Sequence, residues 1–358
     1  MAWVLLVAGL ALLVGGAEGL VRGASSLAGR LGVPPLLIGL TIVAFGTSSP
    51  EIAVSLGAVA QGQSDVALGN AVGSNTFNVL FILGVSALVR PLIVHANLVR
   101  IDVPIMIGAS IALWALLADG SLGRLDGALL LGGLIAYTWF SIRQARRSPE
   151  ASAGTAGAEP SGRERRGMAG AIALIVLGLG AAVVGSRFFV QGAVSIATAL
   201  GVSELVVALT IVAAGTSLPE VVTSVVAAVR GQRDLAVGNV VGSNIFNALG
   251  ILGLAGLAAP AGLEAPTSLL AFDLPVMLAA GVACLPIFFT GHEIRRWEGG
   301  LFLAGYALYV SYLVLDSTGH DALAGFSAIA LYFALPLALL GVIGSVVNAL
   351  RERRPSSG

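Results

Sequence analysis

The chain has 358 residues, of which 57% are hydrophobic and only 11% are charged, and its formal net charge is zero. Soluble domains carry about 25% charged residues, so this composition excludes an ordinary water-soluble protein. A neutral chain with one cysteine and three histidines also excludes a nucleic-acid-binding domain, a disulfide framework and a zinc site.

Eleven apolar runs are long enough to cross a bilayer as helices, since about 20 helical residues span the hydrocarbon core. In chain order these runs are 2–21, 34–60, 66–89, 102–118, 126–142, 168–186, 203–229, 235–259, 269–290, 298–315 and 322–349. The first run lacks a basic leader and a small-residue cleavage site, which favours a retained helix over a signal peptide. Residues 148–167 are rich in Ala, Gly, Ser, Glu and Arg and are expected to form a disordered loop.

The arginines predict the orientation of these spans, because cytoplasmic loops of membrane proteins carry an excess of basic residues. All 19 basic residues are arginine, and several cluster around the loop 148–167. With this loop in the cytoplasm, only Arg124 and Arg187 lie on the outer side. The N-terminus is then expected outside.

An internal repeat dominates the sequence. Residues 16–91 align with residues 185–260 without a gap, and 40 of the 76 aligned positions are identical. Each repeat contains five spans, and because five is odd the second repeat must enter the membrane with the opposite orientation. Inverted repeats are typical of secondary transporters, whose ion sites lie at the midplane between the halves.

The expected fold is therefore an all-α membrane protein built from an inverted-topology repeat of 5+5 transmembrane helices, with an eleventh helix at the C-terminus. A duplicated bundle without a transport role is a less favoured interpretation. The expected parts are a first repeat over 1–147, a cytoplasmic linker loop over 148–167, an inverted repeat over 168–316, and an additional helix and tail over 317–358.

The motif Gly-Thr-Ser-x-Pro-Glu occurs once in each repeat and ends at Glu51 and Glu220. Both glutamates fall near the middle of a span, where an acidic side chain costs roughly 2.5–3.5 kcal/mol. Pro50 and Pro219 lack an N–H and are expected to break each helix and free the carbonyl of the motif's glycine. Carboxylate, hydroxyl and carbonyl oxygens are the ligands that Ca²⁺ and Na⁺ prefer, which predicts a cation site.

A second motif, Gly-Asn-x-Val-Gly-Ser-Asn-x-Phe-Asn, follows in the next span of each repeat. Ser74 and Asn78 are four residues apart and share one helical face, as do Ser243 and Asn247. A single Ser or Asn would favour a simple hydrogen bond between helices. Two symmetric copies beside two glutamates favour an ion site.

The paired motifs resemble the two alpha-repeats of the sodium/calcium exchanger family, within the cation/calcium antiporter superfamily, and the resemblance covers spans one to ten. The proton/calcium branch differs, because its motif carries Asn at the positions of Thr47 and Thr216. The resemblance implies exchange of Ca²⁺ for Na⁺ by alternating access, with spans one and six sliding over a fixed core. It implies main-chain ligands at Ala44 and Ala213. The side chains that it implies as metal ligands are Thr47, Ser48, Glu51, Ser74, Asn78, Thr216, Ser217, Glu220, Ser243 and Asn247.

Some relatives carry Asp at the position of Asn247, so this site is expected to hold two carboxylates rather than three, which leaves the stoichiometry and any potassium requirement open. The resemblance implies a transporter of a prokaryotic plasma (inner) membrane, not an enzyme, with no resident cofactor. Its expected partners are Ca²⁺, Na⁺ and the lipid bilayer, without nucleic acid or an evident protein partner. A proton-coupled antiporter of calcium or another divalent cation is the alternative, and a cation channel is more remote.

Other acidic residues are expected to have structural roles. Glu18 aligns with Arg187 in the second repeat, which argues against Glu18 as an ion ligand. Four aspartates stand at the beginnings of spans and are expected to act as helix N-caps. They are Asp65, Asp102, Asp234 and Asp273.

Overall fold

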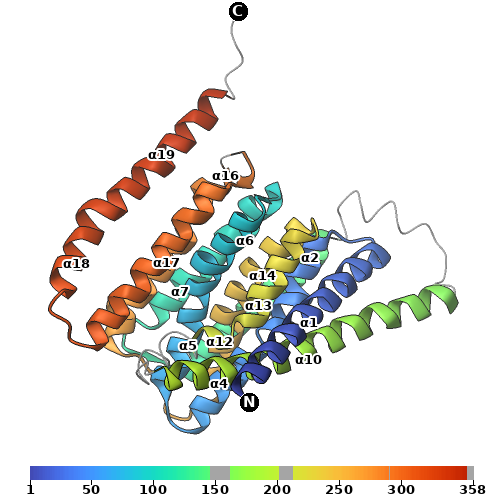
Figure 1. Cartoon of the computed structure of the whole chain (residues 1–358), viewed down its shortest axis with the longest axis horizontal. Helices are drawn as coiled ribbons and strands as arrows, with labels where there is room; N and C mark the ends of the chain where they lie inside the picture. The colour runs from blue at the N-terminus through green and yellow to red at the C-terminus, as the bar shows by residue number, and fades with distance from the viewer. Residues whose placement is uncertain (146–161, 201–212, 290, 353–358) are drawn as a thin grey trace, which may run out of the picture.

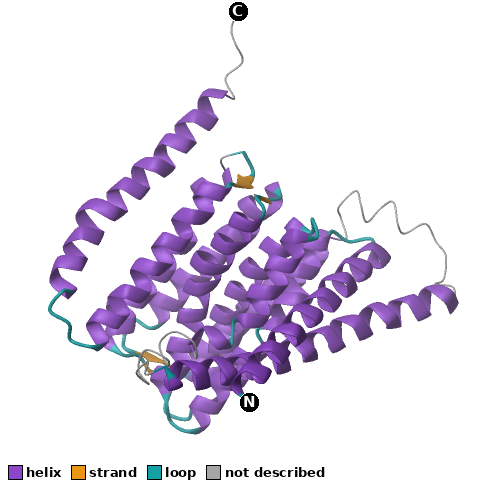
Figure 2. Cartoon of the chain, in the orientation of Figure 1, coloured by secondary structure: helices purple, strands orange, loops and turns teal. Residues whose placement is uncertain are grey.

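A computed structural model describes residues 1–145, 162–200, 213–289 and 291–352 of the chain. The described residues form a bundle of long helices, with four two-residue strands at its two ends (Figure 1, Figure 2). The expected fold class is confirmed: the protein is a helical membrane protein.

The first repeat contains seven α-helices and three π-helices before the long helix α8. They are α1 (Ala2–Leu31), α2 (Pro35–Ile38), η1 (Gly39–Val43), α3 (Ala44–Thr47), α4 (Ser49–Ala60), α5 (Ser64–Phe77), η2 (Asn78–Ile82), α6 (Leu83–Val89), η3 (Leu98–Asp102), α7 (Val103–Leu116) and α8 (Arg124–Ala145). The strands β1 (Leu92–Ile93) and β2 (Ser121–Leu122) lie in its loops.

The second repeat follows the same order. Its helices are α10 (Gly162–Ala199), α12 (Ala213–Gly215), α13 (Leu218–Val229), α14 (Arg233–Ile245), η5 (Phe246–Ile251), α15 (Leu252–Ala258), η6 (Leu269–Asp273), α16 (Leu274–Phe289) and α17 (Arg296–Ser317). Its strands are β3 (Leu263–Glu264) and β4 (Glu293–Ile294). The eleventh span consists of α18 (Leu323–Ile329), η7 (Ala330–Ala334) and α19 (Leu335–Glu352).

These helices follow the expected spans in order, and ten of the eleven expected spans are present in the described part of the chain. Nine unbroken helices in the described part of the chain are long and apolar enough to cross a membrane. The helices 35–47 and 49–60 together form a tenth span, bent by 44°. In the expected span 203–229, residues 201–212 lie outside the described residues, and α13 is a shorter apolar helix.

The linker prediction is partly wrong. Residues 162–167 belong to α10, whose 38 residues extend well beyond the expected span 168–186 at both ends. The physical reason is that Glu and Arg are good helix formers, so a charged stretch next to an apolar span can continue its helix into water. The rest of the predicted loop lies outside the described residues.

The helices α1 and α10, which are the first spans of the two repeats, lie side by side at the front of the bundle (Figure 1). Glycines seven residues apart bring the two backbones together. A Cβ atom on Gly16 would lie only 2.5 Å from the carbonyl oxygen of Gly178 and from the amide nitrogen of Ala182. The remaining glycines in this close contact are Gly9, Gly23, Gly185 and Gly192.

The two repeats also pair at both ends of the bundle. The strand β1 pairs with β4, and β2 pairs with β3, both antiparallel. Each pair therefore joins a loop of one repeat to a loop of the other. The eleventh span stands at the edge of the bundle, where α19 contacts α16 and its described residues are half-buried or exposed (Figure 1).

The expectation that four aspartates act as helix N-caps is wrong for Asp65 and Asp234, and Asp102 stands at the N-cap position of α7 without a cap hydrogen bond from its side chain. Asp65 and Asp234 lie within the first turns of α5 and α14, whose N-cap positions are glutamines. Asp102 accepts a hydrogen bond from the hydroxyl of Tyr137 on α8 at 3.0 Å. The second repeat places the Tyr309 hydroxyl 2.8 Å from Asp273. The carboxylates of Asp102 and Asp273 therefore link neighbouring spans through hydrogen bonds. Both residues lie inside a helix, because a π-helix that ends at each of them directly precedes α7 or α16.

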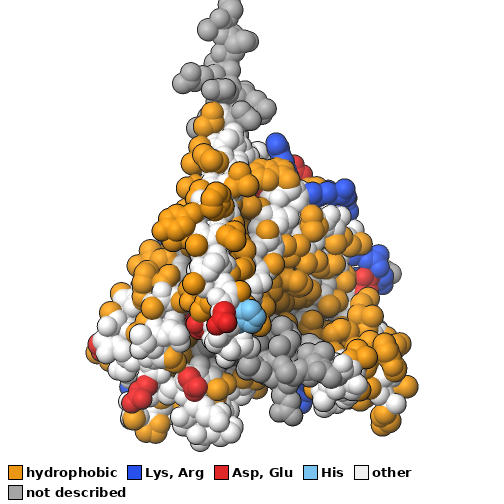
Figure 3. Space-filling model, turned by 60° about the vertical axis from the view of Figure 1, so that its left-hand side comes forward, with side chains coloured by type: hydrophobic (Ala, Val, Ile, Leu, Met, Phe, Trp, Pro, Cys, Tyr) orange, Lys and Arg blue, Asp and Glu red, His pale blue; other side chains and the backbone are white. Residues whose placement is uncertain are grey.

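The surface is divided as expected for a membrane protein. Hydrophobic side chains cover a broad belt, most basic side chains lie toward the upper right, and acidic side chains gather toward the lower edge (Figure 3). The belt matches the low-polarity surface that lipid tails require.

Candidate ion-binding site

Both motif helices break at the same residue of the repeat. The helix α3 ends at Thr47 and α4 begins at Ser49, while α12 ends at Gly215 and α13 begins at Leu218. Ser48 and Ser217 have nearly the same backbone angles, with φ/ψ of −78°/7° and −88°/6°. The sequence prediction of a helix break at each Ser-x-Pro is therefore confirmed.

The breaks place the two glutamates at helix N-termini. Glu51 lies in the first turn of α4, and Glu220 lies in the first turn of α13. Both side chains are almost completely buried. The positive end of a helix dipole stabilises a negative charge, so the local structure reduces the cost of burying each carboxylate.

The two halves exchange hydrogen bonds across the centre of the bundle. Ser217 donates a hydrogen bond to Oε1 of Glu51 at 2.8 Å, and Ser48 donates one to Oε1 of Glu220 at 3.2 Å. The hydroxyls of Ser74 and Ser217 lie 2.9 Å apart. Each carboxylate is thus held by a hydroxyl of the opposite repeat.

The prediction of free glycine carbonyls is wrong. The carbonyl oxygen of Gly46 accepts a hydrogen bond from the hydroxyl of Ser49 at 2.7 Å. The carbonyl oxygen of Gly215 accepts one from Ser186 on α10 at 2.5 Å. Because proline removes the N–H, these hydroxyls take its place as donors.

Asparagines of the second motif position the glutamate backbones. Asn70 donates hydrogen bonds to the carbonyl of Glu51 at 3.2 Å and to the hydroxyl of Ser55 at 2.9 Å. Asn239 makes the equivalent bonds to Glu220 and Ser224, at 3.5 and 3.0 Å. A second pair of asparagines lies between the repeats: Asn78 donates to Oδ1 of Asn244, and Asn247 donates to Oδ1 of Asn75, both at 3.0 Å.

Five side-chain oxygens in this cluster are buried without a hydrogen-bond partner among the described residues. Buried oxygens in proteins are normally hydrogen-bonded, so a group of unsatisfied ones calls for an explanation. Carboxylate, amide and hydroxyl oxygens are ligands for hard cations. The five atoms are Glu51 Oε2, Glu220 Oε2, Asn78 Oδ1, Asn247 Oδ1 and Ser243 Oγ.

The remaining predicted ligands lie around this cluster. Thr47 is buried, and its hydroxyl contacts Oδ1 of Asn239 at 3.2 Å and the carbonyl of Val43 at 3.1 Å. The carbonyl of Ala44 accepts a hydrogen bond from the amide of Ser48 at 3.0 Å. Thr216 is half-buried at the edge of the cluster.

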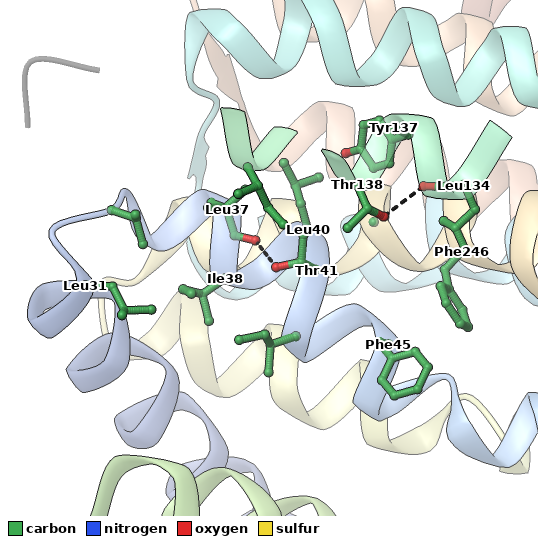
Figure 4. A pocket seen from close by; sticks show the side chains of 14 residues that line it. Leu31, Leu37, Ile38, Leu40, Thr41, Phe45, Leu134, Tyr137, Thr138 and Phe246 are labelled. Atoms are coloured by element: carbon green, nitrogen blue, oxygen red, sulfur yellow. Dashed lines mark hydrogen bonds between the residues drawn. The ribbon is translucent and has the colours of Figure 1, made fainter. Parts of the chain in front are cut away.

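Two cavities lie near the site. One, of about 480 Å³, lies between α4 and α10 and reaches Gly215 and Thr216 at the second helix break. The other, of about 850 Å³, lies between η1, α8 and η5 (Figure 4). The hydroxyls of Thr41 and Thr138 in this larger cavity donate to carbonyls of their own helices, so its walls are apolar (Figure 4). Of these two cavities, the smaller one is lined by a predicted ligand, Thr216.

The charge of the site comes from its two glutamates. No group of three or more His, Cys, Asp or Glu side chains lies together in the described parts of the chain. A cation here would therefore be held by two carboxylates and neutral oxygens, which suits Ca²⁺ or Na⁺ and not a softer metal.

A comparison with known proteins agrees with this geometry. The model of the sodium/calcium exchanger protein family matches residues 1–143 and 170–315. The chain belongs to the sodium/calcium exchanger family. It is thus a multi-pass cation/calcium antiporter, a transporter rather than an enzyme.

Individual members of the family resemble most of the chain. The inner membrane protein YrbG of Escherichia coli is 37% identical and covers 87% of this chain and 97% of its own length. The sodium/calcium exchanger MaX1 of Methanosarcina acetivorans is also 37% identical, over 87% of this chain and 97% of that protein. A solved structure of the sodium-calcium exchanger NCX_Mj matches with a TM-score of 0.75 and 31% identity, over 87% of this chain and 98% of that one. The family match ends at residue 315, so α18 and α19 lie beyond it.

The structure adds members to the candidate ion site that the sequence prediction missed. These are the four asparagines of the second motifs and the π-helices that begin at or next to Asn78 and Asn247. The signal for the asparagines is present in the sequence, because all four are identical between the repeats. A π-turn is frequent at functional sites, but its position depends on tertiary packing. The missed asparagines are Asn70, Asn75, Asn239 and Asn244.

Proposed function

We propose that this chain exchanges Ca²⁺ for Na⁺ across the membrane by alternating access. The observation that carries this proposal is the group of five unsatisfied oxygens at the centre of the bundle. Leaving a buried polar atom without a partner costs about 1–3 kcal/mol, and a bound cation removes that cost. The ten predicted ligands are the residues that we assign to this site.

The charge of the site supports coupling between the two ions. When both Glu51 and Glu220 are ionised, their total charge of minus two is balanced by one Ca²⁺ or by two Na⁺. A third Na⁺ would leave one unpaired positive charge in a low-dielectric environment, where such a charge is costly. The two balanced states compete for the same oxygens, which is the physical basis of exchange.

The helix packing supports access from one side at a time. The cavity between α4 and α10 leads to the site from the side that we predict to be outside. At the symmetry-related position α1 packs against α13, and Glu18 on α1 forms an ion pair with Arg230. Movement of the closely packed α1 and α10 as a unit would open one side and close the other.

The main test is ⁴⁵Ca²⁺ uptake into Na⁺-loaded proteoliposomes, with and without an outward Na⁺ gradient. We expect uptake that requires internal Na⁺ and that collapses when Na⁺ is equal on both sides. The variant Glu51→Gln provides the inactive control, because it removes one charge and keeps the side chain's size.

A proton-coupled antiporter is the second candidate, since an unsatisfied carboxylate oxygen can also hold a proton. The same vesicles distinguish it when they are loaded with an acidic buffer free of Na⁺. Uptake driven by the pH gradient, without any response to Na⁺, would overturn Na⁺ coupling in favour of this alternative.

A further inference from the structure

The cavity that leads to the ion site carries a positive charge in its wall. Arg187 of α10 lines it together with Ser186 and Gln191, and the cavity reaches Thr216 of the site. The side chain of Arg187 is exposed, and it makes no ion pair or hydrogen bond with any described residue. A cationic group without an ion-pair partner among the described residues is unexpected in a passage for cations, because it repels the transported ions.

The symmetry-related position differs in charge. Glu18 on α1 aligns with Arg187 and is held by two arginines: its Oε1 lies 2.5 Å from Nε of Arg22 and 2.5 Å from Nη2 of Arg230. The residues that align with these two arginines in the other repeat are Gln191 and Gln61. Arg187 therefore has neutral residues at the positions where Glu18 has its partners.

We propose that Arg187 is a specificity-determining residue of the outer passage, which lowers the local concentration of Ca²⁺ more than that of Na⁺. The potential of a fixed charge is stronger between low-dielectric walls than in open water. The local concentration of an ion depends exponentially on its charge multiplied by this potential. The factor for a divalent ion is consequently the square of the factor for a monovalent ion.

This inference rests on the proposed function, and it predicts a specific relation between two measurements. In Arg187→Gln, the external Na⁺ concentration for half-maximal transport should fall by about twofold. The corresponding Ca²⁺ concentration should fall by the square of that factor, about fourfold. Maximal rates should stay unchanged, since a saturated site no longer depends on the local concentration. Raising the ionic strength with choline chloride should reduce both effects, because salt screens the charge.

The experiment uses right-side-out membrane vesicles, so that the external face is defined. Entry of ⁴⁵Ca²⁺ in exchange for internal unlabelled Ca²⁺ gives the half-saturating external Ca²⁺ concentration without any need for Na⁺ coupling. Inhibition of this exchange by external Na⁺ gives the half-saturating Na⁺ concentration. A failure of Na⁺ coupling would abolish uptake driven by the Na⁺ gradient and leave the Ca²⁺ measurement intact, so the two proposals fail separately.

Two control variants test whether the charge itself is responsible. Arg187→Lys keeps the charge and should behave as the wild type. Arg124→Gln removes the other arginine that we predict on the outer side, away from this cavity, and should leave both concentrations unchanged. The proposal is overturned if Arg187→Gln changes only the maximal rate, leaves both half-saturating concentrations unchanged, or shifts both by the same factor. It is also overturned if Arg187→Lys behaves like Arg187→Gln, or if Arg124→Gln reproduces the effect of Arg187→Gln.

Discussion

Asn75 and Asn244 hold each other's backbone across the centre of the protein. The side-chain amide of Asn75 donates to the carbonyl of Asn244 at 3.2 Å, and that of Asn244 donates to the carbonyl of Asn75 at 3.3 Å. The two residues occupy equivalent positions in the two repeats, so the symmetry axis passes between them. Their amide oxygens also accept hydrogen bonds from Asn247 and Asn78, which orients these two predicted ligands.

The first prediction concerns this pair. Asn244→Ala removes the side-chain donor to the carbonyl of Asn75 and leaves the side-chain amide of Asn78 without its acceptor. Each unsatisfied buried group costs about 1–3 kcal/mol, so we expect a clear loss of thermal stability in detergent. Asn97→Ala, at an exposed position, should change the melting temperature little. Equal stability of the two variants would show that the pair does not hold the repeats together.

The second prediction concerns the glutamates. Glu51→Gln and Glu220→Gln each keep an oxygen that can accept the hydrogen bond from Ser217 or Ser48, so both variants should fold. Each removes half of the site's negative charge, so we expect Ca²⁺ transport to be abolished. Flux measurements on purified protein, with Glu264→Gln at an exposed position of strand β3 as the control, test this. Substantial exchange by either variant would remove that glutamate from the essential site.

The third prediction concerns the contact between α1 and α10. Gly16→Ala places a methyl group 2.5 Å from backbone atoms of α10, which must move apart, so we expect lower stability and impaired transport. Gly15 has open space at the equivalent point, and Gly15→Ala should be tolerated or slightly stabilising, since Ala favours helix by about 0.5–1 kcal/mol. Thermal unfolding of both variants in detergent measures the difference. Equal effects would mean that helix propensity, not the close contact, governs this interface.

Much of the architecture is predictable from the sequence because the bilayer restricts the possible structures. The membrane requires each span to be helical, and the repeat fixes how the two halves are related. The prolines next to Glu51 and Glu220 locate the helix breaks correctly. The length of α10 is not predictable in the same way. An apolar run indicates only the part of a helix that lies in the membrane, and α10 continues beyond it.

Details of the site depend on contacts between distant residues. The hydroxyl that satisfies Gly215 comes from Ser186 on another span, and its counterpart in the first repeat is Ala17, so the repeat gives no hint of it. The sequence likewise identifies Asn75 and Asn244 as repeated residues but does not indicate that they bond to each other. Such pairs become visible only when both repeats are placed together.

The fourth prediction tests the inverted topology. Gln63 and Gln232 are equivalent residues at the N-cap positions of α5 and α14. A cysteine at position 63 should be labelled by an impermeant thiol reagent from outside, and a cysteine at position 232 from the cytoplasm. The native Cys284 is buried and should give little background. Labelling of both positions from the same side would contradict the inverted repeat.

The fifth prediction concerns the charge of the site at Asn247. In Asn247→Asp the side chain gains a negative charge and loses the amide that donates to Asn75 Oδ1 at 3.0 Å and to the Ser74 hydroxyl at 3.3 Å. Two oxygens then face each other in the ion-free form of this variant, and a bound cation between them would relieve the repulsion. We expect a higher Na⁺ affinity or a higher Na⁺ Hill coefficient, because a total charge of minus three is balanced by three Na⁺.

The variant's stability should also become more dependent on ions. A ligand that binds only the folded state raises its stability, so the melting temperature of Asn247→Asp should rise more steeply with Na⁺ or Ca²⁺ than that of the wild type. Asn78→Asp is the matched variant, since Asn78 donates to Asn244 Oδ1 in the equivalent way. Na⁺-dependent Ca²⁺ flux and thermal unfolding across a Na⁺ titration measure both effects. Identical Na⁺ curves for Asn247→Asp and the wild type would mean that position 247 does not contribute to the charge of the site. The charge balance would then not determine how many Na⁺ ions exchange for one Ca²⁺.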